Sequence, residues 1–144
     1  MSTEQNKALY RRFIEEGFNQ GRLETLDEVL ATGYVNHDAP PGTSSGADGV
    51  KQIIQTFRSA FPDLRIEIEE QVAEGDAVTS RATFHGTHNG PLFGIPATGR
   101  RVTMPGLTMV RVANGRIQEA WVKNDTLGLL QQLGAERLPM PARS

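Results

Sequence analysis

The first 61 residues repeat apolar side chains at helical spacing. Residues 3–20 place an apolar position every three or four residues between charged ones, and Asn19-Gln20-Gly21 ends this pattern with a residue suited to the left-handed conformation. A shorter helix is predicted over 23–30. A third is predicted to begin at Asp48, a suitable N-cap, and to end before Pro62. The N-terminal part of the chain is therefore predicted to be helical.

The pattern changes to alternation of apolar and polar residues after Pro62, which is typical of strands. Strands are predicted over 64–69, 77–87, 101–113 and 116–124. The dipeptide Asn114-Gly115 joins the last two as a hairpin, because both of its residues tolerate positive φ. These strands follow one another without an intervening helix, which predicts an antiparallel meander.

Helices followed by an antiparallel meander indicate an α+β fold rather than repeated βαβ units. We expect the N-terminal helices to pack on a curved antiparallel sheet, with a pocket between the layers and no parallel crossover. Residues 34–37 look extended, and residues 38–47 consist almost entirely of turn formers, which predicts a loop. One domain is expected over 1–138, followed by a flexible tail over 139–144.

Composition narrows the classes of function. The 144 residues carry a formal net charge of −2, which provides no basic surface for nucleic acid or for an anionic membrane. The chain has no cysteine, which excludes disulfides, thiolate metal sites and cysteine nucleophiles. Its first residues are polar, and its longest apolar run falls short of the roughly 20 residues that span a bilayer. A soluble, cytoplasmic protein is the expected class.

Several motifs, in the same order along nearly the whole chain, resemble the SnoaL-like polyketide cyclases of the nuclear transport factor 2-like superfamily. The segments that carry this resemblance are Tyr34–His37, His85–Gly90, Gly94–Arg100, Arg111–Trp121, Asp125 and Leu129–Gly134.

The resemblance implies a cone-shaped α+β barrel with a pocket open at one end, in a homodimer. It also implies ring closure by intramolecular aldol condensation without a metal or an organic cofactor, with the aspartate at position 125 as the acid/base. The superfamily also contains isomerases, dehydratases, epoxide hydrolases and proteins that are not enzymes, so the fold alone does not decide the reaction.

Asp125 has two interpretations. Burial beside the pocket would raise its pKa and suit it to moving a proton next to a carbonyl. Alternatively, it precedes the predicted helix 127–133 and is a good residue to cap that helix. Both roles can hold together.

The histidines are the other candidate catalytic groups. His37 lies at the edge of the proline-rich loop, where it could polarise a carbonyl or orient Asp125, or lie exposed. His85 and His88 are three residues apart, so a regular strand would place them on opposite faces, with His88 nearer the pocket rim. No metal-type spacing such as His-x-x-x-His is present, and we expect no metal site.

The pocket walls are expected to be mostly apolar and aromatic. Leu92, Phe93 and Ile95 are apolar residues inside a loop, and they are expected to form a lid or a dimer contact. For most of the wall candidates, packing in the core is the competing interpretation. The expected substrate-binding residues are Trp121, Tyr34, Asn124, His85, Phe57, Phe61, Met104, Leu107, Met109 and Phe93.

Two classes of function follow. The first is a cofactor-independent enzyme that acts on a small, carbonyl-containing, polyketide-like substrate, with Asp125, His37 and His88 as catalytic residues. Other reactions of the fold, such as epoxide hydrolysis, isomerisation or dehydration, belong to this class. The second is a non-catalytic module that binds a small hydrophobic ligand. Polar groups converging on Asp125 would favour catalysis, and an exposed, capping Asp125 would favour binding.

Overall fold

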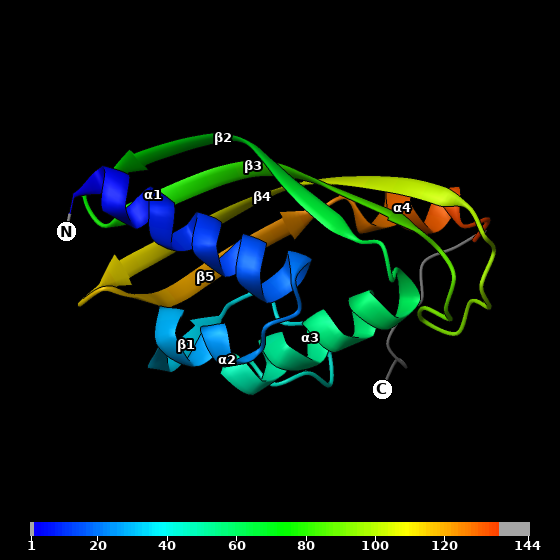
Figure 1. Ribbon diagram of the computed structural model, residues 1–144, viewed down its shortest axis with the longest axis horizontal. Coiled ribbons are helices and arrows are strands. Elements are labelled where there is room, and N and C mark those ends of the chain that lie inside the picture. Colours follow the sequence, from blue (N-terminus) through cyan, green and yellow to red (C-terminus); the bar gives the residue numbers. More distant parts are fainter. Residues whose placement is uncertain (1, 136–144) are drawn as a thin grey trace, which may run out of the picture.

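A computed structural model describes residues 2–135, so the tail expected over 139–144 lies outside the described residues. The first 60 residues are mostly helical, with β1 between α2 and α3, and the strands β2 to β5 follow before a last helix (Figure 1). The elements are α1 (Thr3–Arg12), the π-helix η1 (Phe13–Asn19), α2 (Glu24–Val29), β1 (Leu30–Asn36), α3 (Ala47–Ala60), β2 (Arg65–Glu74), β3 (Ala77–Thr87), β4 (Arg101–Ala113), β5 (Arg116–Asn124) and α4 (Thr126–Gln132).

The sheet has five strands in the order β1-β5-β4-β3-β2. The antiparallel meander β2-β3-β4-β5 confirms the prediction, and its long strands curve (Figure 1). The expectation of a purely antiparallel sheet is wrong, because β1 adds to β5 in parallel and makes the sheet mixed. The sheet also stays open, with β1 and β2 as its edges, so the cone is not a closed barrel.

The first helix is fixed at both ends. Ser2 begins α1 with a capping box in which its hydroxyl accepts from the Gln5 N–H and the Gln5 side chain accepts from the Ser2 N–H. At the other end, the Asn19 side chain pairs with the backbone of Ile66 through two hydrogen bonds of 2.7 and 3.0 Å. This side chain therefore ties the end of η1 to the first residues of β2.

The helices cover one face of the sheet, and the buried side chains form two clusters beneath them. One cluster joins α1, η1, α2 and α3 to β1, β3, β4 and β5, with Leu26, Val29 and Ile54 fully buried. The other, around Phe61, Phe84 and Leu129, joins α3, β3 and α4. Within residues 2–135 no helix is long and apolar enough to cross a membrane.

A hairpin turn and a folded loop connect the long strands. Asn114 and Gly115 adopt φ values of 55° and 73°, which confirms the hairpin between β4 and β5. The loop between β3 and β4 folds back on itself through an isolated bridge between Leu92 and Ile95. Leu92 is buried in the cluster around Phe61, whereas Phe93 remains 48% exposed.

Candidate active site

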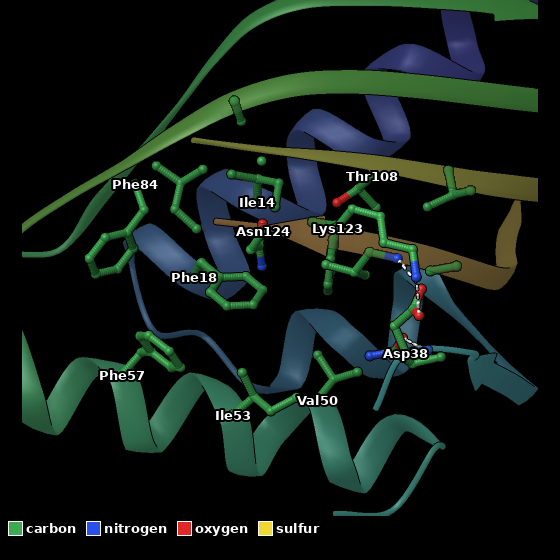
Figure 2. A pocket seen from close by; sticks show the side chains of 18 of the residues that line it. Ile14, Phe18, Asp38, Val50, Ile53, Phe57, Phe84, Thr108, Lys123 and Asn124 are labelled. Carbon is green, nitrogen blue, oxygen red and sulfur yellow. Dashed lines mark hydrogen bonds and ion pairs between the residues drawn. The ribbon is translucent and has the colours of Figure 1, made fainter. Parts of the chain in front are cut away.

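A cavity of about 570 Å³ lies between the helices and the covered face of the sheet. Its walls come from α1, η1 and α3 on one side and from all five strands on the other, and Figure 2 shows their side chains pointing into the space. Most of the lining is apolar or aromatic, which suits a ligand with a large hydrocarbon surface. The apolar lining includes Phe13, Ile14, Phe18, Leu30, Val50, Ile53, Phe57, Ile66, Phe84, Phe93, Met104, Val110, Ile117 and Leu129.

Small residues on the central strands leave room for this cavity. Gly106 and Thr108 on β4, and Ala120 and Val122 on β5, line it. Gly106 has a further effect, because a Cβ at this position would lie 2.0 Å from Oδ1 of Asn124. The missing side chain at Gly106 therefore gives the Asn124 amide its place in the pocket.

A carboxylate and an ammonium group form the charged end of the cavity. Oδ2 of Asp38 accepts a hydrogen bond of 2.7 Å from the Val122 N–H, and Oδ1 accepts one of 2.7 Å from Nζ of Lys123. These two bonds, that from Lys123 first, hold the pKa of the Asp38 carboxyl below its usual range. In Figure 2 this pair lies at one end of the cavity, and Phe57 and Phe84 lie at the other.

The chain around Asp38 is held by the backbone of β1 and β5. Asn36 lines the cavity, and its Oδ1 accepts a hydrogen bond of 2.9 Å from the Asp38 N–H. The His37 N–H donates to the carbonyl oxygen of Ala120 at 2.9 Å. The Asp38 side chain is 24% exposed. Its position is therefore fixed by hydrogen bonds to the neighbouring backbone, although Asp38 is the first residue of a loop-like segment of the sequence.

Sequence reasoning missed Asp38. It placed this residue in a loop of turn formers, and only the parallel pairing of β1 with β5 brings that loop to the cavity. The one feature of the sequence that could have indicated Asp38 is weak: it is an acidic residue close after a short extended segment.

Hydroxyl groups provide a second polar feature of the lining. Tyr10 on α1, Tyr34 on β1 and Thr108 on β4 all line the cavity. Tyr10 and Tyr34 are 5% and 6% exposed, and burial raises the pKa of Tyr10 to about 12. Tyr34 is one of the substrate-binding residues expected from the sequence, whereas Tyr10 was not expected in the pocket.

Asp125 lies outside the cavity lining. Its side chain is exposed at the N-cap of α4, where Oδ1 accepts a hydrogen bond of 2.9 Å from the Gly128 N–H. This is the capping role that the sequence allowed. The structure therefore gives Asp125 a helix-capping role.

His37 also points away from the cavity. Its ring stacks on Trp121, with centroids 4.7 Å apart and planes inclined by 17°, and Nε2 lies 2.8 Å from Oε1 of Glu119. These side chains lie on the uncovered face of the sheet. From that face His37 can neither orient Asp125 nor contact a ligand in the cavity.

His85 and His88 do occupy opposite sides of their strand end, but neither lines the cavity. His88 is fully buried against Phe61, and its Nδ1 accepts from the Thr98 N–H at 3.2 Å and lies 2.9 Å from Oγ1 of Thr98. Burial lowers the pKa of His88. His88 therefore holds the loop between β3 and β4 through its contacts with Thr98, and it is not at the pocket rim.

The remaining wall candidates divide by strand register. Trp121 on β5 and Met109 on β4 are cross-strand neighbours on the uncovered face, and Leu107, 51% exposed, lies on the same face. Phe61 is buried in the core beside the cavity. Side chains alternate along β5, and the pocket is on the face of Ala120, Val122 and Asn124, not on that of Trp121. Those expected residues that do line the cavity are Tyr34, Phe57, Phe93, Met104 and Asn124.

Comparison with known proteins agrees with this architecture. A family model described as SnoaL-like polyketide cyclase matches residues 8–133. The chain belongs to the SnoaL-like polyketide cyclase family. The match covers the helices and strands that line the cavity of this SnoaL-like chain, from α1 to α4.

Relatives and solved structures cover almost the whole SnoaL-like chain. The aklanonic acid methyl ester cyclase DnrD of Streptomyces peucetius is 30% identical over 92% of both chains. The nogalonic acid methyl ester cyclase of Streptomyces nogalater is 29% identical over 81% of this chain and 89% of its own. The structure of TsrD from Streptomyces laurentii is 30% identical, with a TM-score of 0.84 over 93% of this chain and 98% of TsrD. That of wild-type IdmH from Streptomyces antibioticus is 37% identical, with a TM-score of 0.79 over 91% and 99%.

Proposed function

We propose that this protein closes a ring in a polyketide-like carbonyl substrate by cofactor-independent acid/base chemistry, with Asp38 as the base. The observation that carries the proposal is the place of Asp38. Among the residues that the structure describes, it is the carboxylate that lines the cavity, and the rest of the cavity wall is largely apolar. Relatives named as cyclases of polyketide methyl esters support a substrate of this class.

The proposed reaction begins with proton transfer to Asp38. An ionised carboxylate takes a proton from the carbon between two carbonyl groups, and the C–H electrons become those of an enolate. Two lone pairs of Asp38 are engaged by Val122 and Lys123, which leaves others to accept the proton. A depressed pKa is compatible with this step, because a carbon acid flanked by two carbonyls is already acidic.

Ring closure then needs no external reactant. The enolate carbon attacks a second carbonyl of the same molecule, a C–C bond forms, and the attacked oxygen becomes an alkoxide. The alkoxide takes the proton back from Asp38, so atoms and charges balance. The Lys123 ammonium and the Asn124 amide both line the cavity and can stabilise the developing negative charge on oxygen.

The test compares two aspartates, with aklanonic acid methyl ester as the first substrate to try. Asp38→Asn keeps the shape of the side chain but removes the base, and it is expected to lower kcat by about 10²- to 10⁴-fold. Asp125→Asn is the matched control. It is expected to turn over at close to the native rate, because asparagine caps a helix as well as aspartate does. Native turnover by Asp38→Asn, or its loss in Asp125→Asn alone, would contradict the assignment.

A non-catalytic ligand-binding protein is the second candidate. The exposed, capping Asp125 and the mostly apolar walls favour it. In that case the native protein would bind aromatic polyketides without converting them, and Asp38→Asn would change neither binding nor the identity of the recovered ligand. Analysis of the ligand by mass spectrometry and NMR after incubation separates the two candidates.

A further inference from the structure

Three hydroxyl groups from three different elements meet the same cavity. Tyr10 projects from α1, Tyr34 from β1 and Thr108 from β4, and all three belong to the cavity lining. Thr108 is near enough to the phenol of Tyr10 to lower its pKa against the larger effect of burial, and the phenol of Tyr10 adds to the rise in the pKa of Tyr34. We call Tyr10, Tyr34 and Thr108 the hydroxyl cluster.

Each member of the hydroxyl cluster carries one O–H hydrogen that it can donate. Tyr10 and Tyr34 are 5% and 6% exposed, and they line the cavity together with Thr108. Because buried polar groups are normally paired, a donor facing this cavity calls for an acceptor.

The cluster stays protonated and uncharged. Burial raises the pKa of Tyr10 to about 12 and raises that of Tyr34 further above its usual range, with the neighbouring phenol adding to the effect at Tyr34. Neutral donors of this kind suit a carbonyl oxygen, or a carbonyl oxygen on which negative charge develops.

Thr108 and Asp38 lie on opposite sides of β5, whereas Tyr34 belongs to β1, on the Asp38 side. Thr108 on β4 is the cross-strand neighbour of Val122, and the Val122 N–H on the other edge of β5 donates to Asp38. Neighbouring strands are about 4.8 Å apart, so Thr108 and Asp38 are separated by roughly 10 Å at the level of the backbone. One ligand can therefore place two oxygen functions, one at each site.

We propose that the hydroxyl cluster is a second binding subsite of the pocket, which holds a ketone oxygen of a planar polyketone while Asp38 and Lys123 engage another part of the same molecule. The subsite deepens the proposed function and rests on it for the class of substrate. It makes Tyr10, Tyr34 and Thr108 ligand-binding residues that select substrates with oxygen at this distance from the reacting carbon.

The experiment uses two tricyclic probes of similar shape, 9,10-anthraquinone, which carries ketone oxygens, and anthracene, which carries none. Equilibrium dialysis gives Kd for the native protein and for Tyr10→Phe. We expect the variant to bind anthraquinone about 3- to 10-fold more weakly, as expected for one neutral hydrogen bond, and anthracene as tightly as the native protein does. The infrared C=O band of bound anthraquinone should move to higher frequency in Tyr10→Phe, because a hydrogen bond to the oxygen lowers it.

Thr108→Val and Tyr34→Phe are alternative variants should Tyr10→Phe fail to fold. Either is expected to weaken the binding of anthraquinone and to leave the binding of anthracene unchanged. Equal effects on both probes, an unmoved C=O band, or no binding of anthraquinone by the native protein would overturn the subsite. Asp38→Asn separates this result from the proposed function. It should abolish turnover of the methyl ester while leaving the affinity for anthraquinone in place, so either proposal can fail without the other.

Discussion

At the scale of the residue, the ionisation of Asp38 depends on Lys123. Only 24% of the Asp38 side chain is exposed, whereas Lys123 is 76% exposed, so the ammonium group reaches in from solvent to a more enclosed carboxylate. The hydrogen bond from Lys123 is the largest cause that lowers the Asp38 pKa, and the bond from the Val122 N–H is the second. Replacing Lys123 removes the first cause and leaves the second.

Lys123→Met is therefore expected to shift the pH dependence of the reaction. Protonated Asp38 cannot act as a base, so kcat/KM of the native protein should fall only when the pH drops below the ordinary range of an aspartate. In Lys123→Met the Asp38 pKa rises, and the same fall should begin at a higher pH. The measurement is the acid limb of the kcat/KM profile.

Lys51→Met is the matched control for that profile. Lys51 makes a comparable ion pair with Asp27, at 3.1 Å, and does not line the cavity. Its replacement should leave the acid limb where the native protein has it. An identical acid limb in native protein and Lys123→Met would show that Asp38 is not the group that titrates in the reaction.

At the scale of the element, Asp125 connects β5 to α4. Its carboxylate satisfies the Gly128 N–H at the start of a seven-residue helix whose Leu129 and Leu130 are buried. Asp125→Ala should lower the free energy of unfolding by about 0.5–2 kcal/mol, and Asp125→Asn should change it little, because asparagine can accept the same bond. Urea denaturation of the three proteins measures this difference. An equal loss in both variants would mean that the charge, and not the cap, is what stabilises α4.

The elements also show what local pattern can predict. The positions of α2, α3, α4, β3, β4 and β5 and the Asn114-Gly115 hairpin follow from neighbouring residues, and these predictions are confirmed. The strand β1 over Leu30–Asn36 and the length of β2 to Glu74 were not predicted. Alternation states that Trp121 and Val122 face opposite sides, but not which side is covered by helices. That choice depends on packing between α1, α3 and the sheet, and it is why Trp121 was expected in the pocket and Val122 was not.

At the scale of the whole molecule, the family and the α+β fold were predictable, whereas the position of Asp38 was not. Motifs spread over residues 34–134 are local in sequence and identify the fold. The charged end of the pocket instead depends on the parallel contact of β1 with β5, between residues more than 80 positions apart. The homodimer expected from the resemblance stays a prediction, which sedimentation velocity would test.

The cavity lies between the two buried clusters, so its occupant touches both of them. Phe13, Leu30 and Val110 belong to one cluster, Phe84 and Met104 to the other, and all five line the cavity. A ligand there should stabilise the folded molecule as a unit. At a concentration of about 100 times Kd, the stabilisation is about 2.7 kcal/mol, which raises Tm by roughly 5–10 °C in a chain of this size.

Thermal unfolding with a panel of aromatic polyketides measures this effect, and Val122→Phe is its control. The larger ring at position 122 extends into open cavity, so the variant should fold but lose the ligand-dependent rise in Tm. Asp38→Asn should keep most of that rise, because it changes the charged end and leaves the apolar walls intact. An equal rise in Tm in the native protein and in Val122→Phe would show that the ligand binds outside this cavity. The cavity would then not be the binding site for these ligands.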